Sequence, residues 1–141
     1  MGHVTRLPLW LSVAGLVASL AIFVTSIRGM IWPMGDFVLL MGAMALTGPV
    51  LAKFPRTSDP STMMLDREAW GRLLRSRPRW LLVMAVLAGA NGLVHWMAFI
   101  ILNQPKHTQL LPLDSRVLSS SLMAIFCFHV IWYWPTGTPG E

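Results

Sequence analysis

The sequence is poor in ionisable residues, and this scarcity excludes several classes of protein. Only 12% of its 141 residues are Asp, Glu, Lys or Arg, which is about half the share found in a typical soluble domain. Apolar residues make up 55% of the chain. A soluble protein of this length cannot bury so much apolar surface, because small chains leave many residues facing water. The composition therefore excludes a disordered chain, a collagen-like chain and an ordinary cytosolic enzyme.

Cysteine and the common catalytic motifs are also scarce. Cys127 is the single cysteine, so an intrachain disulfide and a CxxC metal or redox site are excluded. The sequence has no HExxH motif, no Gly-rich phosphate-binding loop and no Gly-x-Ser-x-Gly nucleophile elbow. We therefore expect no catalytic residue and no metal site, and we predict that the protein is not an enzyme.

The feature that dominates the sequence is a set of four long apolar runs. A bilayer core about 30 Å thick needs about 20 apolar residues in a helix to cross it, and backbone groups in lipid must be satisfied within the segment. No acidic or basic residue lies between the ends of any run, which disfavours an ion-coupled transporter. We predict an all-α, polytopic membrane protein with one membrane domain, 1–141. Its transmembrane helices are expected at residues 8–27, 36–53, 80–102 and 116–134.

Positive residues are distributed unequally between the connections. Eight of the eleven lie at Arg6 and within residues 53–79, whereas the other three are Arg28, Lys106 and Arg116. The positive-inside rule therefore places both termini and the long middle loop in the cytoplasm, with the helices in two hairpins across the inner (cytoplasmic) cell membrane. The net charge of +5 is explained by attraction to anionic lipids, and no nucleic-acid partner is expected.

The long loop is expected to contain an amphipathic helix over residues 60–77. Met63, Trp70 and Leu74 would share one face of this helix. A basic amphipathic helix between two spans is typical of one that lies on the anionic cytoplasmic leaflet; docking on a partner protein is the alternative. The residues expected at the membrane surface are Arg67, Trp70, Arg72, Arg75, Arg77 and Arg79.

Small residues recur at helical spacing in each apolar run. Such rows let helix backbones approach closely in lipid. Ala88 lies on a row adjacent to that of the small residues in run 80–102. The residues predicted to form helix-packing faces are Ser12, Gly15, Ser19, Gly42, Ala45, Gly89, Gly92, Ser120 and Ala124.

His95 and His129 are the polar residues of most interest inside the runs. Ionisable groups at membrane depth are candidates for function, and each imidazole could serve as the axial ligand of a haem or a chlorophyll. Their expected depths differ by roughly 12 Å, so one shared metal is not expected. In the alternative interpretation, His95 forms a hydrogen bond with Asn91 or with a serine of another helix, and His129 lies in the polar fringe of the membrane.

These observations predict a non-enzymatic membrane subunit that packs through small-residue faces against other membrane proteins or against itself, as an accessory or assembly component. One alternative is a haem- or chlorophyll-binding subunit of an electron-transfer or light-harvesting complex. Another is a small homo-oligomeric channel lined by residues such as Ser12, Ser19, Ser26, Thr47 and Asn91. The sequence does not identify the partner complex.

Overall fold

The protein is all-helical over the residues that the computed structural model describes, which are 6–30, 32–52, 67–102 and 115–135. Four of the helices are long and apolar enough, by length and composition, to cross a membrane. The all-α class is therefore confirmed for this part of the chain. The helices are α1 (Leu7–Ile27), α2 (Pro33–Ala52), α3 (Arg67–Arg75), α4 (Arg79–Leu102) and α5 (Ser115–Tyr133).

The helix boundaries differ from the expected ones mainly at α2 and α3. Helix α2 begins at Pro33, three residues before the expected start, because proline fits the first turn of a helix. Helix α3 ends at Arg75, two residues before the expected end, because the residue that precedes Pro78 disfavours helical geometry. Lys53 and residues 60–66, also expected to be helical, lie outside the described residues.

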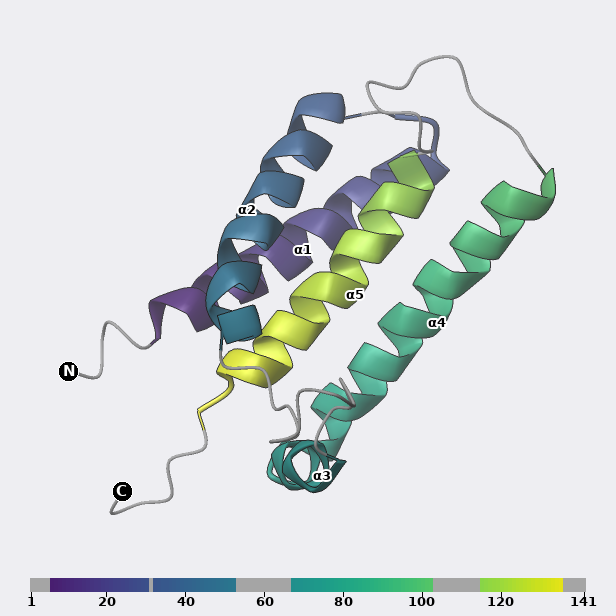
Figure 1. Cartoon of the computed structure of the whole chain (residues 1–141). Coiled ribbons are helices and arrows are strands. Elements are labelled where there is room, and N and C mark those ends of the chain that lie inside the picture. The colour runs from purple at the N-terminus through teal and green to yellow at the C-terminus, as the bar shows by residue number, and fades with distance from the viewer. Residues whose placement is uncertain (1–5, 31, 53–66, 103–114, 136–141) are drawn as a thin grey trace.

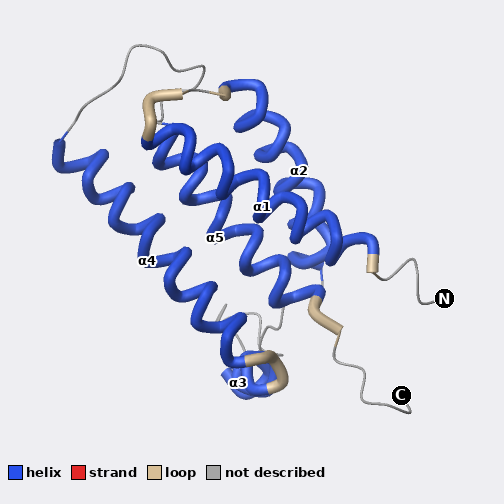
Figure 2. Tube along the Cα trace, turned by 180° about the vertical axis from the view of Figure 1, so that it is seen from behind, coloured by secondary structure: helices blue, strands red, loops and turns tan. Residues whose placement is uncertain are grey.

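Helix α5 is the centre of the structure. It packs against α1, α2 and α4, and α1 also packs against α2. Helix α4 has α5 as its main neighbour and lies on the outer side of the bundle in both views (Figures 1 and 2). The last of the described helices is therefore the one on which the three other long helices assemble.

Consecutive long helices alternate in direction, so the start of α1, the end of α2, the start of α4 and the end of α5 lie at one end of the bundle (Figure 1). Helix α3 is seen end-on in both views at this end, so it runs across the direction of α4. The basic residues of α3 and of the start of α4 are thereby gathered at the same end.

The core consists of apolar side chains of α5 and their neighbours. Leu122 and Phe126 pack with Ala43 of α2, and Val130 packs with Leu81 of α4. By contrast, the outer surface of α4 is apolar and open, with Val86 and Ile101 each 70% exposed. Open apolar surface of this kind is unusual on a monomeric soluble protein.

Candidate functional site

The small-residue row of α1 faces α5. Ser12, Gly15 and Ser19 are all buried, and a Cβ atom added at Gly15 would overlap the ring of Phe126. The two serine hydroxyls donate to carbonyl groups of their own helix, that of Ser12 to Pro8 at 2.7 Å and that of Ser19 to Leu16 at 2.9 Å. These hydroxyls are satisfied within α1, so they give no support to a polar channel.

Helices α4 and α5 approach closely at Gly92. A Cβ atom added there would lie 3.5 Å from the backbone oxygen of Ser120, which is itself fully buried. One turn further along α4, the indole nitrogen of Trp96 donates to the Ser121 hydroxyl at 2.6 Å. Ala124, on the same helix as the two serines, is half-buried.

The small residues of α2 and one glycine of α4 lie on the outside. Gly42, Ala45 and Gly89 are exposed, and nothing lies within 4 Å of a Cβ atom added at either glycine. Helix α2 instead turns Ala43 and Val50 inward. The structure therefore brings Gly15, Gly92 and the buried serines of α1 and α5 into contacts between helices. It leaves Gly42, Ala45 and Gly89 without a neighbouring described helix.

His129 is buried in a contact between α5 and α2. Its Nε2 lies 3.0 Å from the hydroxyl oxygen of Thr47, and that hydroxyl lies 2.6 Å from the carbonyl oxygen of Ala43. A hydroxyl has one proton to donate. Because the Thr47 hydroxyl donates its proton to the Ala43 carbonyl, it can only accept from Nε2 of His129. Nε2 is then the protonated nitrogen, and Nδ1 is a bare acceptor. Nδ1 is buried and completes no hydrogen bond with a described residue.

A second hydrogen bond between helices lies one turn further along α5. The Tyr133 hydroxyl donates to the backbone oxygen of Leu46 in α2 at 2.9 Å. Sequence reasoning did not pair Thr47 with His129 or Tyr133 with α2. The one sequence signal for these pairs was that Thr47 lies near the end of run 36–53 and that His129 and Tyr133 lie near the end of run 116–134, because both ends are expected on the cytoplasmic side.

His95 has a different environment on α4. It is half-buried, and its Nδ1 lies 2.8 Å from the Asn91 backbone oxygen. Because only a protonated nitrogen can donate to a carbonyl, Nδ1 carries the proton and Nε2 is bare. The ring also packs edge-on against Phe23 of α1, with 5.0 Å between ring centroids. His95 thus forms a hydrogen bond with Asn91, one of the two partners that the alternative interpretation expected, and it does so through the backbone oxygen of Asn91.

The basic end combines an exposed part and a buried part. Arg67, Arg72, Arg75 and Arg79 are exposed, whereas Arg77 is only 6% exposed. The Arg77 side chain donates from Nε to the Ile131 carbonyl at 2.6 Å and from Nη2 to the Trp132 carbonyl at 3.4 Å. A guanidinium here satisfies carbonyl groups at the C-terminal end of α5.

Burial lowers the pKa of the Arg77 guanidinium below its usual value, yet arginine is effectively always protonated in proteins. The positive charge therefore stays beside the negative end of the α5 dipole. Trp70 of α3 is half-buried and packs near Phe128 and Trp132 of α5, at 6.1 Å and 6.2 Å between ring centroids. Two residues expected at the membrane surface, Arg77 and Trp70, thus contact α5.

Within the described residues, no group of three or more His, Cys, Asp or Glu side chains could hold a metal ion. No protein-family model, curated protein or solved structure matches the chain.

Proposed function

We propose that the protein is a multi-span membrane protein whose four long helices cross the bilayer. Their length and hydropathy support this proposal, as does the open apolar surface of α4. The alternating directions place the exposed arginines of α3 and α4 at one end. By the positive-inside rule this end lies in the cytoplasm, where α3 contacts the anionic leaflet of the inner cell membrane.

Within the membrane, the protein acts as a non-enzymatic accessory or assembly subunit that binds another membrane helix. The observation that carries this proposal is the outward position of Gly42 and Ala45 on α2. Small residues on a lipid-facing surface let a second backbone approach closely, which is the main source of helix association in lipid. The row on α1 and Gly92 of α4 are already used inside the bundle, whereas Gly42 and Ala45 of α2 have no neighbouring described helix and can receive a partner or a second copy.

The test compares two alanine-to-leucine substitutions on different helices. Ala45→Leu adds bulk to the α2 face, and Ala21→Leu adds the same bulk to an exposed position of α1. Tagged variants would be released from native membranes in mild detergent and sized on native gels. We expect the larger assembly to be lost with Ala45→Leu and kept with Ala21→Leu. A wild-type protein that always migrates as a lone monomer would refute the proposal.

A second candidate function is the binding of a tetrapyrrole at His95. The specific observation in its favour is the hydrogen bond from Nδ1 to the Asn91 carbonyl. A histidine that ligates a metal usually donates its other nitrogen in this way. At His129 the protonated Nε2 bonds with Thr47 and the bare Nδ1 is buried, so ligation there stays a prediction that requires the side chains around Nδ1 to move.

An absorption spectrum of protein purified from cofactor-replete cells distinguishes the two candidates. A Soret or Qy band that disappears with His95→Ala and persists with His129→Ala would establish the tetrapyrrole site. Colourless protein would refute the tetrapyrrole site and leave the accessory role as the remaining candidate.

A further inference from the structure

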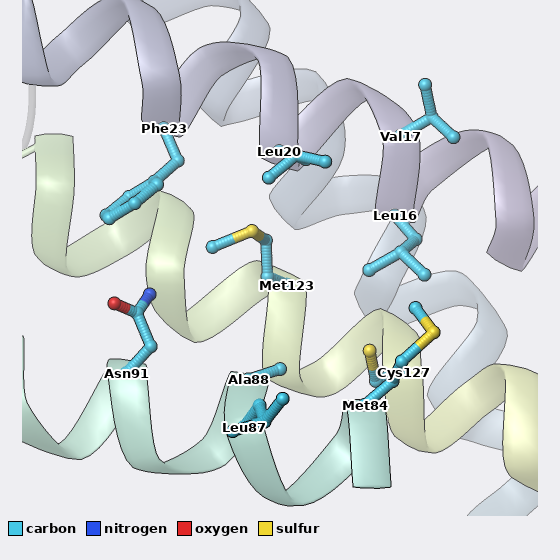
Figure 3. Close-up of a pocket in the computed structure, with 10 residues that line it drawn as sticks. All are labelled: Leu16, Val17, Leu20, Phe23, Met84, Leu87, Ala88, Asn91, Met123 and Cys127. Carbon is cyan, nitrogen blue, oxygen red and sulfur yellow. The ribbon is translucent and has the colours of Figure 1, made fainter. Parts of the chain in front are cut away.

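An apolar groove lies between α1 and α4, with α5 as its floor (Figure 3). Helices α1 and α4 both pack on α5 but do not pack closely against each other along their length; the Phe23 and His95 rings meet near one end of the space between them. The groove has a volume of about 440 Å³. Its lining includes Leu20 and Phe23 of α1, Met84 and Ala88 of α4, and Met123 and Cys127 of α5.

Asn91 is the one amide in this lining. Figure 3 shows its side chain rising from α4 toward Phe23 at one end of the groove. Its backbone oxygen accepts the hydrogen bond from His95, but no described residue forms a hydrogen bond with its side-chain amide. An amide in apolar surroundings gains from any ligand that supplies a hydrogen-bond partner.

The size and chemistry of the groove select among possible occupants. Water is disfavoured because an ordered water needs two to four polar partners. Between Met84 and Asn91 the groove extends about 10 Å along α4, and its length and apolar lining suit an extended hydrocarbon chain. Because no charged residue lines the groove, a charged headgroup has no counterpart there. A narrow, neutral molecule fits these limits.

The open side of the groove indicates where such a molecule comes from. Val17 and Leu87 line the groove and are 61% and 64% exposed, so it opens toward the surroundings of the bundle. Asn91 is twelve residues from Arg79, which places it about 18 Å along α4 from the basic end. In a bilayer this is the depth of the hydrocarbon chains.

We propose that the groove binds a neutral long-chain lipid, whose chain lies between α1 and α4 and whose uncharged oxygen accepts a hydrogen bond from the Asn91 amide. This inference rests on the membrane insertion proposed above and is independent of the helix-binding face on α2. The flexible thioethers of Met84 and Met123 suit an irregular chain, as in many apolar ligand sites with one or two polar groups.

The experiment uses two photoreactive probes that differ by one group. One is a long-chain ketone with a diazirine near the carbonyl, and the other has a methylene in place of the carbonyl. The full chain would be reconstituted in phosphatidylcholine vesicles, illuminated and mapped by mass spectrometry. We expect the ketone to label the α5 segment around Cys127 about fivefold more than the hydrocarbon, the ratio that one net hydrogen bond gives.

Three variants test the two parts of the site. Asn91→Leu keeps the branched shape of the side chain but removes its amide, and it should abolish the preference for the ketone while the hydrocarbon still labels the groove. Ala88→Phe fills the groove from its α4 side and should remove labelling by both probes, whereas Ala90→Phe, on the exposed side of α4, should leave it unchanged. Circular dichroism checks that each variant keeps its helices.

Three results would overturn the lipid site: no labelling of the wild-type groove, equal labelling of it by both probes, or labelling that Ala88→Phe leaves intact. Resistance of the vesicle-bound chain to carbonate extraction is measured in parallel. A chain that is inserted but not labelled in the groove overturns only the lipid site, whereas a chain extracted by carbonate overturns the proposed membrane function.

Discussion

Gly15 and Gly42 belong to similar rows of small residues but have opposite surroundings. The Phe126 ring occupies the space that a side chain at Gly15 would need, whereas the space beside Gly42 is open. The same glycine-to-alanine change should therefore have different effects on stability at the two positions, and this comparison tests the packing of α1 on α5.

We predict that Gly15→Ala lowers the free energy of unfolding by about 1–3 kcal/mol, because overpacking forces the buried Phe126 or the backbone to shift. Gly42→Ala should leave it unchanged or raise it slightly, since alanine favours a helix over glycine. Thermal unfolding in detergent measures both. Phe126→Leu should restore part of the stability of the Gly15→Ala variant; equal stability of the two single variants would contradict the packing described here.

A single hydrogen bond between helices can be tested at Thr47. Thr47→Val keeps the shape of the side chain but leaves Nε2 of the buried His129 without its partner. We expect a loss of about 1 kcal/mol. Thr25→Val is the control, because the Thr25 hydroxyl donates to the Ile22 carbonyl of its own helix at 2.9 Å. If the two variants unfold at the same temperature, the contact between α2 and α5 contributes no net stability.

At the scale of the element, α3 and the end of α5 are joined by Arg77. Arg77→Met removes the guanidinium from the carbonyls of Ile131 and Trp132. The last turn of α5 and helix α3 should then exchange amide hydrogens faster, because the helix end loses its cap and its favourable charge.

The control for this prediction is Arg75→Met. Arg75 is exposed and donates to the Gly71 carbonyl of its own helix at 3.1 Å, so exchange at the end of α5 should not change. Because arginine keeps its proton at ordinary pH, the difference between the variants should be the same from about pH 5 to about pH 9. Equal exchange in both variants would show that Arg77 does not hold the two elements together.

The sequence predicted the helices well but predicted their inward faces only in part. On α1 the row that contains Ser12 and Ser19 is both small and polar, so polarity and size indicate the same inward side. Helices α2 and α4 are apolar on all sides, and a small-residue row there does not distinguish a neighbour in the bundle from an external one. This is why Gly92 packs on α5 whereas Gly42 and Gly89 lie outside.

Contacts between distant segments were beyond the reach of the sequence for a different reason. The bond between His129 and Thr47 joins positions 82 apart in the chain, and its existence depends on the rotation of two helices about their axes. Periodicity fixes which residues share a face, but it does not fix which face meets which helix.

For the whole molecule, the decisive prediction is its orientation. We expect protease added to inside-out membrane vesicles to cleave near the exposed arginines of α3, and protease added to intact cells to leave this region uncut. A terminal tag should be accessible from the same side as α3. Cleavage of residues 67–75 only from outside intact cells would contradict the proposed orientation.

The central position of α5 has a consequence for biosynthesis. A ribosome completes α1, α2 and α4 before it reaches the helix on which all three pack. In the membrane topology proposed above, helix α4 enters the bilayer before its main neighbour exists, and a nascent chain that stops short of residue 115 lacks the helix that joins α4 to α1 and α2. In this topology, final assembly of the bundle is post-insertional, because it requires the last long segment to have left the translocon.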